Sequence, residues 1–336
     1  RLLADRLGWQ EPLAANRGRG VACSASDAGA EPVSTALVRV HADGSVTVCV
    51  GTTELGQGSR TVLAQIAAEE LGVDYEQVRV AASDTALVPY DRSTGASRST
   101  TVVGLAVQEA CRDARSQMVK MAAQVLGLPE QAVSERPGGV DAGGAFLRWD
   151  EVIRRYFNLP AGEVMGRGYV RRAGPLATLP VFWEIGMTGV EVAVDRETGL
   201  VTVEHLVTVG DVGKAVHPAC AEGQDLGAAT MGLGHALFEE IVLEGGQMLN
   251  NDMLSYRVPR AMDMPGQVDT LLVENQDGVG PCGLKGGGEG SLNPVAPAVA
   301  NAVARAVGVR IRELPLTPER VWRALQVRPD DGQRRV

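Results

Sequence analysis

The chain repeats one pattern of hydrophobic and polar positions at two places. Hydrophobic residues alternate with other residues on both sides of Asp43-Gly44, a pair typical of a two-residue β-turn, and so predict a hairpin over 33–50. A turn with the pair Gly56-Gln57 follows, and 59–71 has hydrophobic residues at helical spacing. The succession of hairpin, Gly-Gln turn and helix recurs over 189–239. We interpret it as an internal repeat that forms two related lobes.

The remaining pattern completes a mixed fold. Further helices are expected over 1–9, 102–126, 149–157, 295–307 and 318–325, a strand over 77–82, a basic loop over 16–20 and a linker over 171–180. The predicted class is α+β (mixed), with two lobes of β-hairpins packed with helices and a cofactor between them. The expected ranges are a lead-in at 1–20, a first cofactor-binding lobe at 21–135, a connecting segment at 136–182 and a second lobe at 183–336.

Composition limits the partners of such a protein. The 336 residues are 45% hydrophobic with 41 glycines, which favours close backbone packing, and only 4% are aromatic. The net charge of −9 argues against a nucleic acid or an anionic membrane as partner. Hydrophobic runs stay shorter than the ~18 residues that a membrane-spanning helix needs. Residue 1 is Arg, which suggests a trimmed start, and no secretory signal is recognised there.

The cysteines and histidines do not form a recognisable metal site. The five cysteines are odd in number and lack C-x-x-C pairs, which suits neither zinc nor an iron–sulfur cluster. We therefore expect buried free thiols in a reducing compartment, and hence a cytoplasmic protein. The four histidines stand alone in the sequence. If a metal is present, a cofactor must bring most of its ligands.

The stretch 283–291 holds five glycines and one carboxylate, Glu289, directly before a predicted helix. Asn293 and Pro294 suit the start of that helix, whose N-terminus would favour an anionic ligand. A carboxylate on such a turn is a candidate general base, and the plain alternative is a tight turn with a solvated Glu. A P-loop is excluded because Lys285 precedes the glycines. A dinucleotide fingerprint is disfavoured because 273–281 makes a poor strand.

Three other small-residue turns also precede predicted helices. In 51–58, the Gln57 amide can donate and accept hydrogen bonds at once. In 93–101, several hydroxyls and Arg98 could bind phosphate, although helix capping would explain one of the hydroxyls. The third turn, 223–227, contains Gln224. Four such turns in one chain suggest that backbone and amide groups converge on a large, polar, anionic cofactor.

These stretches resemble a known family. The segments are Gly51–Gly58, Thr94–Ser99, Gly223-Gln224 with Met231-Gly232-Leu233-Gly234, and Gly286–Gly290. Together they resemble the molybdenum-cofactor-binding subunit of the xanthine oxidase family of molybdenum hydroxylases. The resemblance runs from about residue 18 to 323 and covers only the C-terminal half of that subunit.

The resemblance implies a cofactor, a reaction and a role for each site residue. The cofactor is molybdenum-molybdopterin in its cytosine dinucleotide form, and Glu289 is the base in a hydroxylation that uses water. No protein side chain is expected to bind the metal directly. The implied cofactor-binding residues are Gly56, Gln57, Gly58, Gly95, Ala96, Ser97, Arg98, Ser99, Gln224, Gly287 and Gly288.

The resemblance also implies partners and leaves alternatives open. Another chain would supply the N-terminal half, and iron–sulfur and FAD subunits would take the electrons. Prolines usual in purine-oxidising members are missing near Glu289, so xanthine is in doubt, whereas aldehyde, N-heterocycle, carbon monoxide and acyl-CoA thioester oxidation remain open. The alternatives are a non-catalytic scaffold lobe of such a complex and a domain that binds a plain dinucleotide.

Overall fold

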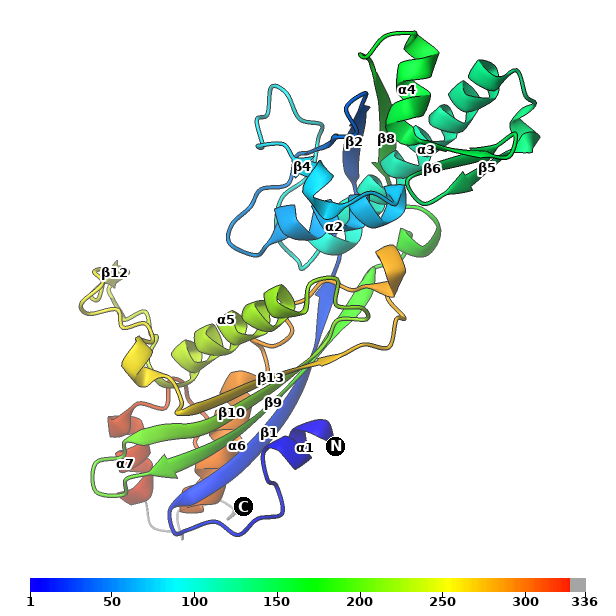
Figure 1. Ribbon diagram of the computed structural model, residues 1–336. Coiled ribbons are helices and arrows are strands. Elements are labelled where there is room, and N and C mark those ends of the chain that lie inside the picture. The colour runs from blue at the N-terminus through cyan, green and yellow to red at the C-terminus, as the bar shows by residue number, and fades with distance from the viewer. Residues whose placement is uncertain (327–336) are drawn as a thin grey trace.

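The computed structural model describes residues 1–326 as two lobes that meet at a waist (Figure 1). The lower lobe holds a four-stranded sheet of order β1-β9-β10-β13, and the upper lobe holds one of order β4-β3-β2-β8. The lower elements are α1 (Leu2–Arg6), β1 (Arg17–Ala28), β9 (Phe182–Val194), β10 (Val201–Asp211), α5 (Pro218–Leu237), β13 (Gln267–Val273), α6 (Val295–Val307) and α7 (Pro318–Gln326). The predicted mixed α+β class is confirmed.

The upper lobe adds a three-stranded sheet to its main one. Its elements are β2 (Ser34–His41), β3 (Val46–Val50), α2 (Ser59–Leu71), β4 (Val78–Val80), α3 (Gly104–Leu126), β5 (Val133–Arg136), β6 (Gly139–Ala142), β7 (Ala145–Arg148), α4 (Trp149–Phe157) and β8 (Glu163–Val170). A turn of π-helix over Ser99–Val103 leads into α3. A short hairpin, β11 (Leu243–Glu244) and β12 (Gln247–Met248), extends from the lower lobe (Figure 1).

The two main sheets share one topology. In each, an antiparallel hairpin (β2–β3 or β9–β10) has a parallel strand at one edge (β4 or β13) and an antiparallel strand at the other (β8 or β1). A helix, α2 or α5, connects the hairpin to the parallel edge strand. This correspondence agrees with the internal repeat that the sequence pattern indicates.

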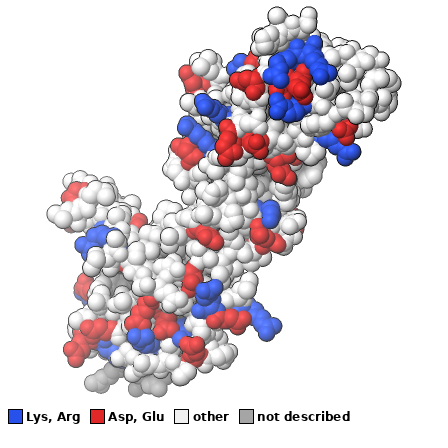
Figure 2. All heavy atoms as spheres, in the orientation of Figure 1, with Lys and Arg blue, Asp and Glu red and all other residues white. Residues whose placement is uncertain are grey.

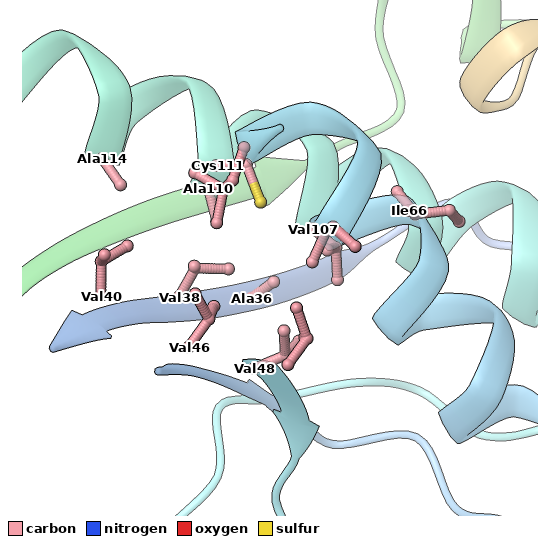
Figure 3. Packing of buried hydrophobic residues seen from close by; sticks show 14 of the residues in the cluster. Ala36, Val38, Val40, Val46, Val48, Ile66, Val107, Ala110, Cys111 and Ala114 are labelled. Atoms are coloured by element: carbon pink, nitrogen blue, oxygen red, sulfur yellow. The ribbon is translucent and has the colours of Figure 1, made fainter. Parts of the chain in front are cut away.

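The helix-facing side of the upper sheet forms a core of small aliphatic side chains. Figure 3 shows Val38 and Val40 of β2 and Val46 of β3 beneath Ala110 and Ala114 of α3. All five are at most 1% exposed. Burying a side chain such as valine contributes about 1.5 kcal/mol or more. The alternation of buried and half-buried positions along β2 therefore fixes which face of this strand meets the helices.

Glycine pairs bring an edge strand of each sheet directly onto a helix. A Cβ at Gly166 or Gly168 of β8 would lie 2.0 or 1.9 Å from a backbone oxygen of α3. A Cβ at Gly18 or Gly20 of β1 would lie 2.1 Å from a backbone oxygen of α6. Larger side chains at these positions would force the strand away from the helix. The abundant Gly and Ala thus serve the close backbone packing expected from composition.

Strand pairing groups the residues differently from the ranges 21–135, 136–182 and 183–336. β1 pairs with β9 in the lower sheet, although it lies early in the chain. β8 pairs with β2 in the upper sheet, although it lies in the range expected to connect the lobes. The basic loop predicted at 16–20 is the start of β1, where Arg17 and Arg19 form ion pairs with Glu191.

Two predicted helix starts are also corrected. Gly223-Gln224 lies inside α5 and not in a turn, because the helix begins at Pro218 and His217 Nδ1 accepts a hydrogen bond from Cys220 N. Asn293 does not cap α6, since the side chain of Asn293 donates to Ser26 Oγ at 2.7 Å. The other end of α6 is as predicted, with Gly308 in the left-handed region.

Charged side chains of both signs lie on the surface, and the cysteines are unpaired. Figure 2 shows acidic and basic side chains intermixed at both ends of the molecule, with a mostly uncharged band between them. Within residues 1–326, no helix is long and apolar enough to cross a membrane. All five cysteines are free thiols, but only Cys111 is buried, and its burial raises its pKa to about 12. Cys23 and Cys282 are exposed, in contrast to the expectation.

Candidate functional site

A polar cleft lies at the waist, where segments of both lobes meet. Its volume is about 410 Å³. The lining residues are Gln57, Thr94, Gly95, Ser97, Arg98, Ser99, Thr100, Gln224, Gly227, Ala228, Met231, Gly286, Gly287, Gly288, Glu289 and Leu292. The structure thus brings together all four segments singled out in the sequence. Of the predicted site residues, Gly56, Gly58 and Ala96 lie in these segments but do not line the cleft.

Glu54, which the sequence analysis missed, organises the first turn. Its carboxylate accepts hydrogen bonds from the N–H groups of Gly56 and Gly58, both at 2.9 Å. Partial burial acts to raise the pKa of Glu54, but these backbone bonds and that of Arg60 lower it overall. An acid two to six residues before several glycine and helix-start N–H groups was the signal that could have revealed it.

Gln57 is fixed in place by its own turn. Its Oε1 accepts from Leu55 N at 2.6 Å, and its Nε2 donates to Thr53 O at 2.9 Å. A primary amide carries two N–H donors, so one remains to meet a group in the cleft. The Gln57 amide is therefore a preorganised donor at the edge of α2.

The second loop is held by Arg98 from behind. Arg98 is fully buried and donates to Asp91 Oδ1, Ser93 O and Val33 O. These hydrogen bonds are all internal, whereas the sequence led to the expectation that Arg98 adds charge for a phosphate; Arg98 also borders the cleft. Ala96 and Ser97 have φ of +54° and +48°, a region that residues other than glycine rarely adopt. Arg98 follows these two residues directly in the chain, and its hydrogen bonds anchor this end of the loop.

The third segment presents one face of α5 to the cleft. Gln224, Gly227, Ala228 and Met231 recur at the spacing of neighbours on one side of a helix. Gln224 of this face is predicted from the sequence, whereas Gly227 and Ala228 are not, although the same helical spacing indicates them. The Gln224 side chain makes no hydrogen bond within residues 1–326, so its amide remains available to a ligand.

The fourth turn places Glu289 opposite the second loop. Glu289 is exposed to the cleft, and its Oε2 accepts a hydrogen bond from Ser97 Oγ at 2.7 Å. A Cβ at Gly286 would lie 1.5 Å from Ser97 O, so only glycine permits this approach. Gly288 has φ +117° and lies against Gln224. A Cβ added at Gly288 would be 3.3 Å from the Cβ of Gln224. The turn thus joins the loop from the upper lobe to α5 of the lower lobe.

The chemistry of the lining residues fits a polar organic cofactor. Amides, hydroxyls and glycine backbone groups face the cleft, and glycines allow close approach of a ligand. A smaller cavity of about 70 Å³ adjoins it, lined in part by His217, Cys220 and Lys285. Among residues 1–326, no group of three or more His, Cys, Asp or Glu side chains could hold a metal ion.

Comparison with known proteins identifies the family. Residues 3–265 match the model of the molybdopterin cofactor-binding domain. The chain belongs to this family. It is 31% identical over 331 residues to the probable hypoxanthine oxidase XdhD of Escherichia coli strain K12, covering 96% of this chain and 34% of that protein.

Other relatives of the family are named as molybdenum-binding subunits. The chain is 33% identical over 322 residues to the xanthine dehydrogenase molybdenum-binding subunit of Escherichia coli O157:H7, covering 91% of this chain and 42% of that subunit. It is 32% identical over 330 residues to the aldehyde oxidoreductase molybdenum-binding subunit PaoC of Escherichia coli strain K12, covering 95% and 43%. The chain thus spans less than half the length of these relatives.

Solved structures agree with this assignment of the fold. Quinoline 2-oxidoreductase from Pseudomonas putida 86 superposes with a TM-score of 0.83 and 25% identity, covering 98% of this chain and 45% of that one. The fold of this chain is therefore that of the molybdenum-binding subunit of the xanthine oxidase family, as the sequence motifs indicate. The roles of the single residues remain predictions.

Proposed function

We propose that this chain forms part of the molybdopterin site of a molybdenum hydroxylase. The reaction would add oxygen from water to the carbon of an aldehyde or an N-heterocycle. The observation that carries the proposal is the convergence of Gln57, Ser97, Gln224 and Glu289 on one cleft from four separate segments. Membership in the molybdopterin cofactor-binding domain family supports it.

Each group in the cleft would have a distinct task. The amides of Gln57 and Gln224 and the backbone around Gly95 and Gly288 would bind and orient the polar parts of the cofactor. When bound, the molybdenum cofactor would supply the two-electron redox chemistry. Glu289 would accept the proton at a carboxylate oxygen, while Ser97 holds its Oε2. The second oxygen, Oε1, is left to face the reacting groups.

The proposal includes partners. Relatives that are more than twice as long as the stretch matched here support a further polypeptide segment or chain for the remainder of the molybdenum subunit. One relative is named as the gamma subunit of the 6-hydroxypseudooxynicotine dehydrogenase complex, which supports additional subunits. We place iron–sulfur and FAD centres on such subunits and the assembly in the cytoplasm.

The form of the cofactor can be tested by its nucleotide. We propose the cytosine dinucleotide form, so acid hydrolysis of the purified complex should release about one CMP for each molybdenum. Chromatography of the released nucleotide checks this. Molybdenum without CMP would refute the dinucleotide form and leave the rest of the proposal intact.

Metal analysis of the assembled complex tests the proposed site. We expect about one molybdenum per chain, and turnover of an aldehyde or an N-heterocycle with an artificial electron acceptor. Gln224→Ala should lower the molybdenum content, because the amide that faces the cleft is lost. The matched control is Gln247→Ala, which removes an exposed amide from the β12 hairpin and should keep full occupancy. A purified wild-type complex without molybdenum would contradict the proposal.

A further inference from the structure

Two buried carboxyl groups lie behind the turn that carries Glu289. Glu184 of β9 is 3% exposed, and Asp225 of α5 is 2% exposed. Neither forms an ion pair with Lys, Arg or His within residues 1–326, and none of the groups that shift either pKa is a cation. Burying an unpaired carboxylate is costly, so such groups tend to keep a proton. Neither residue is among those that the sequence pattern predicts for the site.

The packing places both carboxyl groups against the same face of the lower sheet. A Cβ at Gly290 would lie 2.6 Å from Glu184 Cγ, so the Glu184 side chain packs directly against the turn that carries Glu289. A Cβ at Gly210 would lie 2.5 Å from Asp225 Oδ2. Gly210 of β10 is the partner of Gly186 in β9, two residues after Glu184 and therefore on the same face.

Ser97 connects this buried layer to Glu289. Its hydroxyl donates to Glu289 Oε2 at 2.7 Å and also lies near enough to Glu184 to affect the pKa of that carboxyl. A hydroxyl has one proton to donate and two lone pairs. While it donates to Glu289, it can only accept a hydrogen bond from the Glu184 side.

Buried polar atoms without hydrogen-bond partners lie in this layer. Glu184 Oε2, Asp225 Oδ2 and Ser291 Oγ are buried without a hydrogen-bond partner in the described chain. An unsatisfied buried polar group costs about 1–3 kcal/mol. Protonation turns a carboxyl oxygen from an acceptor into a donor, which suits the lone pairs of Ser97.

The groups that face Glu184 favour its neutral form. Burial is the largest influence and raises its pKa, and the nearby carboxyls of Glu289 and Asp225 raise it further. The Gly290 N–H and the Ser97 hydroxyl act in the opposite direction without reversing the shift. Burial also raises the pKa of Asp225, to about 6, against a smaller opposing effect of Ser291.

We propose that Glu184 is a positioning residue that, in its protonated form, donates to Ser97 and so keeps the Ser97 hydroxyl directed at Glu289. Glu184 touches neither substrate nor cofactor and acts only through Ser97 and the turn at Gly290. Loss of its proton would let the Ser97 hydroxyl turn toward Glu184 and would leave Glu289 facing a second negative charge. The inference rests on the proposed function, in which Glu289 is the base.

Infrared spectroscopy of the assembled complex tests the proton directly. A buried protonated carboxyl has a carbonyl stretching band that a carboxylate lacks. We expect a band in the wild-type complex that persists to higher pH than the band of an ordinary glutamic acid, and its absence in Glu184→Gln. An unchanged band in Glu184→Gln would overturn the proposal. Asp225 is a second buried carboxyl with a raised pKa, so the band is assigned to Glu184 only if it is lost in Glu184→Gln and kept in Asp225→Asn.

The pH profile of turnover per bound molybdenum tests the consequence. Glu184→Gln keeps an N–H donor toward Ser97 that cannot ionise, so its turnover should match that of wild type while Glu184 is protonated and should lack the decline that follows ionisation of Glu184. Glu184→Ala should lose roughly 10- to 100-fold at every pH, the order expected when a catalytic group is misplaced by about 1 Å. Glu197→Gln, an exposed carboxyl on the β9–β10 turn, should keep the wild-type profile.

The outcomes separate this inference from the proposed function. A wild-type profile in both Glu184 variants would refute the positioning role while leaving Glu289 as the base. A complex without molybdenum or turnover would refute the proposed function, and loss of the infrared band in Glu184→Gln would still report whether Glu184 holds a proton.

Discussion

Glu289 and Asp225 are two carboxyl groups near the same turn, and their different surroundings give them different chemistry. Glu289 is exposed to the cleft and accepts a hydrogen bond from Ser97. Asp225 is buried on the other side, and burial raises its pKa to about 6 from 3.8. Glu289 can act as a base in the cleft. Asp225 keeps its proton to a pH well above the one at which an aspartic acid usually ionises.

The raised pKa of Asp225 predicts a pH-dependent change in stability. Below about pH 4 the carboxyl is protonated in both the folded and the unfolded chain. As pH rises toward 6, only the unfolded chain loses the proton, so folding stability falls by ~3 kcal/mol for a shift of about two pKa units. Asp225→Asn cannot ionise and should escape this loss. The melting temperature of the variant, relative to wild type, should therefore rise between pH 4 and pH 7.

Asp195→Asn is the contrasting control for this measurement. Hydrogen bonds from Thr198 and from the Glu197 N–H lower the pKa of Asp195, so its contribution to stability is present above its unfolded pKa and lost on acidification. This variant should therefore be less stable than wild type at pH 7. The difference in stability should become smaller at acid pH. If Asp225→Asn followed the same trend as Asp195→Asn, Asp225 would not be a buried, protonated group.

Single residues differed in how far the sequence could reveal them. Glu289 was recognisable because it is the only acid among five glycines before a helix. Glu184 and Asp225 were not, because their environment is created by residues distant in sequence, such as Gly290 and Gly210. The internal partners of Arg98 were not recognisable for the same reason, since they include Val33 O from another segment.

At the scale of elements, the close approach of two glycine-containing turns holds the cleft together. Gly286→Ala places a Cβ 1.5 Å from Ser97 O, so one of the two turns must shift. We expect a loss of about 1–3 kcal/mol in the free energy of unfolding, the usual cost of overpacking, measured by denaturant or thermal unfolding.

The neighbouring glycine provides the control for Gly286→Ala. In Gly287→Ala the new Cβ would lie 3.4 Å from Val212 Cγ1, an ordinary contact, and the unfolding transition should stay close to wild type. Equal destabilisation by both substitutions would show that the approach to Ser97 is not what matters.

Local pattern revealed the elements that depend on local sequence. The β2–β3 and β9–β10 hairpins and helices α2, α4 and α6 follow from turn chemistry and periodicity, and the structure has them. β1, β8 and β13 were missed, because they are edge strands whose partners lie far away in the chain. β8 in addition contains Gly166 and Gly168, which weaken a strand pattern but are needed for contact with α3.

At the scale of the whole molecule, the lobes that form the cleft leave large apolar side chains exposed to solvent. Large apolar side chains remain exposed on the segment after α5: Leu254 is 95% exposed, Met262 91% and Met253 78%. Exposed apolar groups of this kind are typical of surfaces that another chain or segment covers. The relatives, which are more than twice as long as this chain's matched stretch, agree with that reading.

We therefore predict that this chain, produced alone, will not retain molybdopterin or turn over substrate. The polar cleft would lose contacts that the remainder of the molybdenum subunit supplies. Molybdenum content and activity of the chain alone, compared with the assembled complex, check this expectation. A singly produced chain with about one molybdenum and full turnover would refute it.

The most direct test of the account is the turnover per bound molybdenum of Glu289→Gln in the assembled complex. The substitution preserves size and can still accept the Ser97 hydrogen bond, but it cannot take up the proton. General-base catalysis contributes about 10² to 10⁴-fold, so turnover should fall by at least ~10²-fold while molybdenum content stays near wild type. A fall of less than about tenfold, or ~1.4 kcal/mol in the barrier, would contradict the assignment of Glu289 as the base.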